Sequence, residues 1–536
     1  MVTTKRIRPV GMFDEVRIVT FDVPVDGEGP VLDDVRTVPA KISKSKFVAG
    51  IQCLKRLYWE VHEPELAAAP DASAVARLQQ GHEVGRLARQ LFPGGVEIQS
   101  TRERLGDAIR ATRELVANRE VPAIFEATFE HGGVLVRVDI LQRRDRNRWR
   151  LLEVKSTADL KDYHLFDVGI QRHVVSHCGL KLSSSSLMHL SREYIFRGGA
   201  YDLGQLFRIR NLNRQLPKLQ RKLTTQLRSE CHILSQPQPP DVAPGRHCRK
   251  PVLCEFFACC NPERPLDHVT RLPRINARTV EELKALGVES IRDIPEDFPL
   301  NDMQRRACAS VKTGQLWRST DLNKQLQTLK YPLCFMDFET VNPALPRFAG
   351  MKPFDYVVFQ WSVHWQDTPD APIEHFEFLA DDHADPRLPF LESLCEVIQG
   401  AATIVVYYQK FESGRLAELA EWFPQYEKRI ARAQARLWDL LPIIRDNVYH
   451  PAFQGSFSLK RVLPALVPEM SYESMEVSDG AEAGVAWEKM LTCEDAERKD
   501  LRSSLLAYCG QDTFAMVRLL NVLRLRANVQ GGAEAP

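Results

Sequence analysis

The sequence predicts an α/β fold that is built from more than one domain. Apolar runs of strand length alternate with amphipathic helical stretches in two separate parts of the chain, residues 123–190 and 333–408. At 536 residues with 44% hydrophobic side chains, the chain can bury the cores of about two to four domains. We expect five segments: an unassigned N-terminal extension (1–40), a first domain (41–265), a helical connector (266–325), a second domain (326–525) and a disordered tail (526–536).

Composition narrows the protein class. The formal net charge is +1, so any affinity for nucleic acid must come from local basic clusters and not from a global field. No early apolar run resembles a signal peptide, and none approaches the roughly 18 residues of a spanning helix. We therefore expect a cytoplasmic protein without a membrane partner. In that reducing compartment the 12 cysteines argue against disulfides, which leaves buried thiols, catalysis or metal binding.

The first domain should begin with two helices. Ser43 is placed to cap the first, in which apolar residues recur at helical spacing and Cys53 lies on or near the apolar face. The second spans 74–92 and carries His82. Taken alone, Cys53 is a core residue and His82 is a structural or solvated histidine.

A third helix at 102–118 leads to a strand at 123–129 that contains Glu126. The apolar runs 134–141 and 149–154 follow, and they flank a turn rich in Arg, Asp and Asn. This pattern predicts a β-hairpin.

Each strand of this hairpin carries a carboxylate. Asp139 lies on the first strand and Glu153 on the second, and an unpaired buried carboxylate costs several kcal/mol or more. Lys155 lies two residues after Glu153 and therefore on the same face of the strand. Two acids and a lysine suit phosphodiester hydrolysis, in which the acids hold Mg²⁺ or Mn²⁺ and the lysine orients water.

The helix predicted at 159–180 places Gln171 downstream of the acids. His173 and His177 are spaced as a metal pair, but Val174 stands where a zinc protease motif has Glu. We predict that both histidines are structural or face DNA.

A strand at 185–190 and a long helix at 203–234 should complete the sheet region. The basic residues of this helical stretch are either a solvated face or a surface that follows a nucleic-acid backbone. They are Arg208, Arg210, Arg214, Lys218, Arg221, Lys222 and Arg228.

Cysteines concentrate at the end of the first domain, where Cys248, Cys254 and Cys260 are spaced by five residues and Cys259 precedes the last. Two C-x₂-C knuckles, which a zinc ribbon requires, are absent from this stretch. The spacing favours an iron–sulfur cluster with Cys53 as the distant fourth ligand, and zinc is the alternative. Cys259 is the alternative to Cys260.

Residues 280–295 of the connector have the pattern helix, Gly-containing turn, helix. The pattern is loosely similar to a helix-hairpin-helix DNA-backbone binder. A plain interdomain connector fits it equally well.

The second domain carries its own set of acids. Asp337 and Glu339 are two apart on a predicted strand, so both side chains point to one face, as ligands of a shared divalent ion do. Glu412 begins a later helix, and Tyr508 and Asp512 share one face of a long helix predicted at 494–526. Strands at 356–364, 373–379 and 403–408 lie between these motifs. This order of motifs is typical of a two-metal exonuclease.

The motifs of residues 41–265 resemble the RecB-type branch of the PD-(D/E)xK nucleases, in particular its iron–sulfur members such as the CRISPR-associated exonucleases and the AddB nuclease domain. The resemblance implies a restriction-endonuclease-like core. His82, Asp139 and Glu153 would be metal ligands assisted by the Val154 carbonyl, Lys155 the catalytic lysine, and Gln171 a residue that holds Lys155 and the DNA. The remaining implied residues are Glu126 and the [4Fe-4S] ligands Cys53, Cys248, Cys254 and Cys260. The family has an aromatic residue four positions after the glutamine, where this chain has Val175.

Residues 326–525 resemble the RNase H-like DEDD 3′→5′ exonucleases of the tyrosine subtype. This resemblance implies a mixed sheet with flanking helices, metal ligation by the four acids and a Tyr508 that positions the attacking water. The middle motif departs from the family, because Phe411-Glu412 stands where the family has Phe-Asp. Asp439 is the alternative acid. The two domains together resemble an uncharacterised bacterial family known as a domain of unknown function.

We therefore expect a Mg²⁺- or Mn²⁺-dependent DNA nuclease with two sites, acting as an exonuclease on single strands or ends in repair, recombination or defence. Two other functions use the same residues. One is a nucleic-acid-binding scaffold that recruits a helicase while one or both sites are inert, and the other is an RNA-processing exonuclease.

Overall fold

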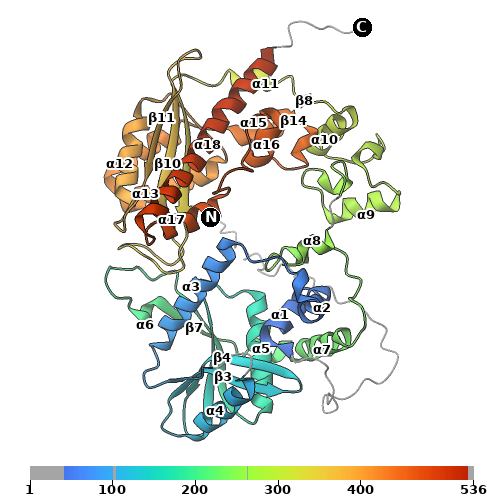
Figure 1. Cartoon of the computed structure of the whole chain (residues 1–536), viewed down its shortest axis with the longest axis vertical. Helices are drawn as coiled ribbons and strands as arrows, with labels where there is room; N and C mark the ends of the chain where they lie inside the picture. Colours follow the sequence, from blue (N-terminus) through green and yellow to red (C-terminus); the bar gives the residue numbers. More distant parts are fainter. Residues whose placement is uncertain (1–41, 100–103, 262–263, 529–536) are drawn as a thin grey trace, which may run out of the picture.

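The computed structural model describes residues 42–99, 104–261 and 264–528 and shows an α/β protein in two lobes (Figure 1). Each lobe contains one large mixed sheet with helices packed on it. The predicted α/β multidomain class is thus confirmed. The predicted extension at 1–40 lies outside the described residues. The disordered tail predicted at 526–536 is wrong at its start, because the last helix continues to Asn528, and 529–536 lie outside the described residues.

The first lobe holds a seven-stranded sheet in the order β2-β3-β4-β5-β6-β7, with β1 paired to β4. Strands β3, β4 and β5 pair antiparallel, which confirms the predicted hairpin, and β5 and β6 run parallel. The strands are β1 (Ile42–Ser43), β2 (Val96–Glu97), β3 (Ala123–His131), β4 (Val134–Arg143), β5 (Arg148–Lys155), β6 (Lys181–Leu190) and β7 (Phe207–Asn211). The helices are α1 (Lys44–Gln52), α2 (Leu54–His62), α3 (Ala72–Arg89), α4 (Leu105–Ala117), α5 (Asp162–His177), α6 (Leu203–Leu206), α7 (Leu216–Leu234) and α8 (Phe257–Cys260).

The hairpin opens at the point where its acids lie. Pairing of β4 with β5 ends at Ile140 opposite Leu152, and the next residue on each strand is Asp139 or Glu153. An Asp139 carboxylate oxygen accepts a hydrogen bond from the Val154 N–H at 2.7 Å and so replaces the missing strand-to-strand bond. Helix α5 connects the parallel strands β5 and β6 and returns Gln171 to Glu153.

The single helix predicted at 203–234 is wrong. Residues Phe207–Asn211 form β7, which pairs antiparallel with β6, and α7 begins only at Leu216 with Pro217 in its first turn. Without β7, strand β6 would expose a row of unpaired backbone groups, and their pairing outweighs local helix propensity. The seven basic residues of this stretch are all exposed.

A buried glutamate on α7 makes stability depend on pH. Glu230 is fully buried, its Oε1 accepts a bond from Gln226, its Oε2 has no hydrogen-bond partner, and burial raises its pKa well above 4.5. The folded state therefore disfavours the ionised form, so stability falls as pH rises above about 4.5. We expect Glu230→Gln to leave unfolding unchanged at pH 4.5 and to stabilise the protein by about 2 kcal/mol at pH 8. Urea unfolding at both pH values checks this, with exposed Glu114→Gln as control; equal effects at both values would contradict it.

The connector packs with the second lobe. Its elements are α9 (Ala277–Ala285), α10 (Asp302–Thr313), β8 (Trp317–Arg318) and α11 (Leu322–Leu326). The helix predicted after Gly287 is wrong, because Ile291–Asp293 form one 3₁₀ turn. Ile291 and Ile294 are buried in the same apolar cluster as the second-lobe sheet, so packing determines this segment.

The second lobe contains a five-stranded sheet in the order β11-β10-β9-β12-β13. Strands β9, β10 and β11 form an antiparallel meander, and β9, β12 and β13 run parallel. The strands of this lobe are β9 (Leu333–Val341), β10 (Val357–Gln366), β11 (Glu374–Leu379), β12 (Thr403–Val406), β13 (Leu437–Asp439) and β14 (Val448–Tyr449), which pairs with β8. Its helices are α12 (Arg387–Val397), α13 (Gln409–Trp422), α14 (Glu427–Gln434), α15 (Leu440–Asn447), α16 (Leu459–Leu466), α17 (Gly480–Met490) and α18 (Asp495–Asn528).

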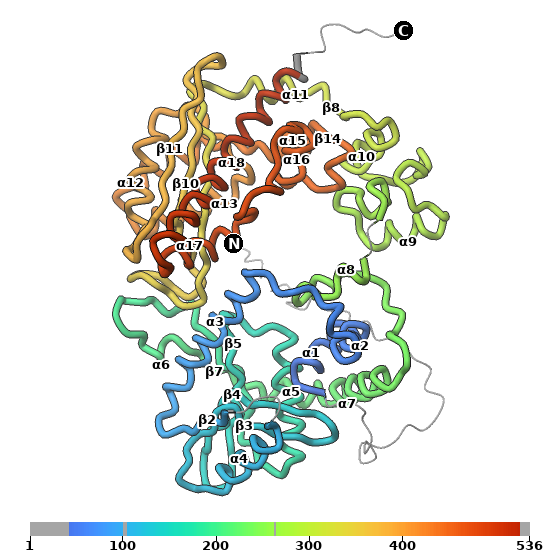
Figure 2. The backbone as a smooth tube through the Cα atoms, in the orientation of Figure 1, coloured from blue at the N-terminus to red at the C-terminus, as the bar shows by residue number. Residues whose placement is uncertain are grey.

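The long helix α18 crosses the sheet (Figure 2). The Gln360 side chain on β10 donates to the Leu505 carbonyl at 2.8 Å, and the hydroxyls of Ser362 and Thr513 lie 2.8 Å apart. These buried bonds fix the position of α18 along β10. They therefore determine which residues of α18 face β9.

The two lobes also touch directly. Phe196 exchanges backbone hydrogen bonds of 2.8 Å with Gly350 and Met351, and Ala344 is buried among apolar residues of the first lobe. The segment that follows Glu339 on β9 therefore anchors one lobe to the other. Within the described residues, no helix is both long and apolar enough to cross a bilayer.

Candidate functional site

Three carboxylates from β9 and α18 meet in the second lobe. Asp337, Glu339 and Asp512 each offer an oxygen, and these oxygens lie within 4.8 Å of one another. Oxygens on opposite sides of one Mg²⁺ lie roughly 4.2 Å apart, so the spacing suits a single divalent ion. Residues separated by more than 170 positions are brought together by the packing of α18 on β9. The structure thus assembles the two predicted outer motifs.

Glu412 lies beside this group at the start of α13. Its side chain is 2% exposed, its Oε2 has no hydrogen-bond partner, and the nearby Asp337 carboxylate contributes to its raised pKa. The preceding Tyr408 has a left-handed backbone (φ 85°), which is costly outside glycine and sets the direction in which α13 begins. A buried carboxylate oxygen without a partner fits a metal ligand.

Asp439, the alternative middle acid, has a structural role instead. Its carboxylate accepts hydrogen bonds of 3.0 Å from the backbone N–H groups of Tyr408, Gln409 and Leu441. It therefore caps α15 and holds the start of α13 in place. These bonds occupy the oxygens of Asp439, which favours Glu412 as the fourth acid.

Two tyrosines flank Asp512. The Tyr472 hydroxyl donates a short hydrogen bond to an Asp512 oxygen, and the Tyr508 ring lies 6.4 Å from the Tyr472 ring. Burial and the Asp512 charge raise the pKa of both hydroxyls, which therefore stay protonated. The exposed Lys460 on α16 places its ammonium 5.8 Å from the Tyr508 ring centre and so brings a cation near the acids.

Helix α17 closes the site on another side. A Cβ atom on Gly480 would lie 3.3 Å from a Glu339 carboxylate oxygen, and one on Gly484 would lie 3.0 Å from Val341. Glycine at both positions lets the first turns of α17 approach β9 closely. A larger residue at 480 would press on the Glu339 carboxylate.

The second-lobe acids repel one another. Burial and the neighbouring acids raise the pKa of Asp337 and Glu339 well above the usual values. Burial raises the pKa of Asp512 to about 6, although the Tyr472 hydrogen bond opposes this, and that of Glu412 to about 9. In the described part of the chain no lysine or arginine pairs with any of the four. Such a cluster gains most from a bound cation.

The first-lobe acids are arranged differently. Both Glu153 oxygens lie 2.9 Å from the ammonium of Lys44, a residue that no sequence motif indicates. The predicted Lys155 lies 2.7 Å from Glu153, and the predicted Gln171 donates to the same carboxylate at 2.7 Å. The structure therefore brings Asp139, Glu153, Lys155 and Gln171 into one cluster, and adds Lys44 and Asp167.

Lysines neutralise most of this cluster. Burial alone would raise the pKa of Glu153, but the ammoniums of Lys155 and Lys44 hold it well below its usual range. Burial and the Glu153 charge raise the pKa of Asp139 to about 7. Burial alone would lower the pKa of Lys44, but the surrounding carboxylates raise it.

The predicted metal role of His82 is contradicted. His82 is exposed on α3, and among the described residues it forms no three-ligand group with Asp139 and Glu153 within 4.8 Å. The helix buries Val84, Leu87 and Ala88, and this packing turns His82 toward solvent. Glu126 does not join the acids either, because it forms an ion pair with Arg89 on the same helix. The residues present do not fit the metal site that the first resemblance implies.

The histidines of α5 lie in a ring cluster. His177 stacks on His131 with ring centres 4.8 Å apart, and His173 lies 4.2 Å from His177. Gln220 contacts the His173 ring at 3.1 Å. This arrangement agrees with a structural role.

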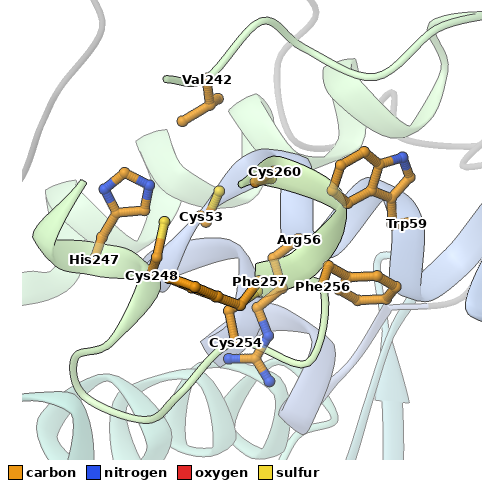
Figure 3. A pocket seen from close by; sticks show the side chains of 10 residues that line it. All are labelled: Cys53, Arg56, Trp59, Val242, His247, Cys248, Cys254, Phe256, Phe257 and Cys260. Atoms are coloured by element: carbon orange, nitrogen blue, oxygen red, sulfur yellow. The ribbon is translucent and has the colours of Figure 1, made fainter. Parts of the chain in front are cut away.

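The predicted cluster cysteines line one small pocket (Figure 3). The structure breaks the predicted first helix at Cys53, whose extended backbone (φ −164°) ends α1 and begins α2. Gln52 donates to the carbonyls of His247 and Val252 at 2.7 and 2.8 Å, which ties this break to the cysteine segment. The pocket cysteines are Cys53, Cys248, Cys254 and Cys260, all free thiols.

The pocket is wider than a zinc site. Sulfurs around one tetrahedral zinc lie about 3.8 Å apart, but among the described residues no three of these thiols fall within 4.8 Å of one another. Cys53 is still close enough for the thiols of Cys248, Cys254 and Cys260 to interact with it electrostatically. Cys259 is exposed and its thiol points to the Leu66 carbonyl. Cys260, and not Cys259, therefore lines the pocket together with the other three cysteines.

Several residues of these sites were missed. Asp167 lies four residues before Gln171 on α5, a spacing that could have indicated it. Tyr472 lies in an irregular segment, and Lys460 and Lys44 each share their helix with another basic residue; no local pattern marks them.

Part of this chain is similar to a family without assigned function. Residues 334–458 match the family described as Domain of unknown function (DUF2779), a range that includes Asp337, Glu339 and Glu412. The chain is 24% identical over 212 residues to the uncharacterized protein UU173 of Ureaplasma parvum serovar 3, covering 35% of this chain and 31% of that protein. It is 26% identical over 215 residues to the uncharacterized protein MG366 homolog of Mycoplasma pneumoniae, covering 36% and 32%.

The matched segments thus span about a third of the length of either relative. Among solved structures, the family B DNA polymerase of Pyrobaculum calidifontis is similar with a TM-score of 0.23 and 12% identity, over 72% of this chain and 44% of the polymerase. A score this low supports no conclusion about fold or function.

Proposed function

We propose that the second lobe is a Mg²⁺- or Mn²⁺-dependent nuclease that hydrolyses phosphodiester bonds in DNA, at single strands or ends. The observation that carries the proposal is the convergence of Asp337, Glu339 and Asp512, which form no ion pair with a lysine or arginine among the described residues. Oxygen-only ligands suit hard divalent ions. The sheet order, with a meander followed by two parallel strands, agrees with the RNase H-like resemblance.

The residues of the site have separable tasks. Asp337, Glu339, Asp512 and Glu412 would hold the ions, which supply charge neutralisation and an activated water. The protonated Tyr508 hydroxyl would orient that water. Tyr472 holds the Asp512 carboxylate in one orientation, and Lys460 would attract the phosphate backbone toward the acids.

End-labelled substrates test the proposal. Purified protein with Mn²⁺ should shorten single-stranded DNA, and EDTA should stop the reaction. Duplex DNA and RNA in parallel reactions separate the DNA exonuclease from an RNA-processing enzyme. Retention of DNA without cleavage under every metal condition would instead support a scaffold that recruits other enzymes such as a helicase.

Removal of the Tyr508 hydroxyl and removal of the Tyr472 hydroxyl should affect different properties of the enzyme. Tyr508→Phe should lower kcat about 10²-fold and change metal affinity less than Tyr472→Phe does, because Tyr508 makes the smaller hydrogen-bond contribution at Asp512. Tyr472→Phe should weaken Mn²⁺ binding about 10-fold, because it frees a carboxylate that holds the ion. Titration of activity against Mn²⁺ distinguishes them, with Tyr163→Phe in the first lobe as control. Identical metal dependence in both variants would contradict these roles.

We propose further that Cys53, Cys248, Cys254 and Cys260 hold a [4Fe-4S] cluster with a structural role. Support comes from the four free thiols around one pocket and from their spacing, which is too wide for a single zinc ion.

A further inference from the structure

We propose that the first acid cluster is closed by its own lysine. The Lys44 ammonium occupies the place between Asp139, Glu153 and Asp167 that a divalent cation would take, and it excludes Mg²⁺ and Mn²⁺ from this cluster. The inference concerns the first lobe alone and is independent of whether the second lobe cleaves DNA.

The contacts of Lys44 are those of a central cation. Its Nζ lies 2.9 Å from each Glu153 oxygen, 3.7 Å from an Asp167 oxygen and 4.0 Å from an Asp139 oxygen. A lysine that formed a simple ion pair would contact one carboxylate. Here one ammonium faces three, from β4, β5 and α5.

The donors around Glu153 leave no room for an ion. Lys44, Lys155 and Gln171 all donate to its carboxylate, which is 1% exposed. Lys155 also contacts Asp167 at 2.6 Å, so a second ammonium engages the same carboxylates. A metal ion could reach the Glu153 oxygens only by displacing an ammonium.

Charge balance identifies Lys44 as the group that stands in for the ion. With all three carboxylates ionised, the two ammoniums leave one negative charge in the cluster. Removal of Lys44 would leave two, which one divalent ion neutralises. Lys155 would remain in its position beside Glu153.

The backbone delivers Lys44 to this place. Strand β1 pairs with β4 through Ile42 opposite Val134, and the Ser43 hydroxyl caps α1 by accepting from the Lys46 N–H. Lys44 is therefore the first residue of a capped helix whose start is fixed to the sheet. Its side chain then extends along β4 to the point where β4 and β5 separate, at Asp139 and Glu153.

Manganese binding tests the proposal. The full-length protein carries Asp337→Asn, Glu339→Gln and Asp512→Asn to silence the second-lobe acids, and free Mn²⁺ is measured by electron paramagnetic resonance. In this background Glu153→Gln should leave Mn²⁺ binding unchanged, because Lys44 already excludes the ion. Addition of Lys44→Met should create a Mn²⁺ site at least about tenfold tighter than any in the background protein that retains Lys44, called the Lys44 protein. Further addition of Glu153→Gln should remove that site.

Controls keep the outcome decisive. Lys46→Met, on the same helix, and Lys44→Arg, which keeps the charge, should gain no site. A Mn²⁺ ion in the Lys44 protein that disappears with Glu153→Gln would overturn the proposal, as would a folded Lys44→Met protein that gains none. If Lys44→Met does not fold, the comparison of the Lys44 protein with its Glu153→Gln variant still decides the question.

Discussion

Replacement of Asp512 by asparagine should abolish metal-dependent cleavage, with a loss of at least about 10³-fold in kcat/KM. Asp512 is one of three acids whose oxygens converge, and it is the member that α18 supplies. The amide keeps the shape of the side chain and can still accept from Tyr472, but it removes the charge that an ion requires. The same change removes repulsion among buried acids.

The Asp512→Asn protein should therefore be at least as stable as the wild type without metal, while Mn²⁺ stabilises it less. Thermal unfolding with and without Mn²⁺ measures this beside the cleavage assay. The exposed Asp500→Asn on the same helix is the matched control. Full cleavage by the Asp512 variant would place the active site elsewhere.

Replacement of Cys53 by serine should remove the iron–sulfur chromophore and lower the melting temperature by about 10 °C or more. Cys53 is the ligand that comes from the start of the domain, and the other three come from residues 248–260. Its loss opens the connection between these two segments, so the effect on stability should exceed that of a buried thiol alone.

Anaerobic purification followed by visible absorption and iron and zinc analysis makes the measurement. Cys259→Ser should keep colour and melting temperature, because its thiol lies outside the pocket. Cys178 is exposed and does not line the pocket, so Cys178→Ser controls for the loss of a thiol in general. Zinc with no iron in the wild type would contradict the cluster, and an unchanged spectrum in Cys53→Ser would contradict the distant ligand.

Motifs with a local period could be predicted from sequence. Asp337 and Glu339 are two apart on a strand, and Tyr508 and Asp512 are four apart on a helix, so each pair shares a face whatever the rest of the fold does. The hairpin that carries Asp139 and Glu153 followed from its apolar runs and turn. These features depend on secondary structure alone.

Features set by tertiary packing could not be predicted. The face of α3 that turns His82 to solvent depends on which side buries Val84 and Leu87. Strand β7 forms because β6 offers an edge, against the helical pattern of its residues. Lys44 is one of 71 lysines and arginines, and only the pairing of β1 with β4 selects it.

Helix α1 connects the cysteine pocket to the first-lobe acid cluster. Lys44 is its first residue and Cys53 immediately follows its last, so one helix about 13 Å long links the acid cluster to the cysteine pocket. A variant that alters Cys53 should therefore also be examined at Lys44. In the Cys53→Ser protein, Mn²⁺ titration of the first-lobe acids and the spectrum of the pocket therefore report on the two ends of one helix.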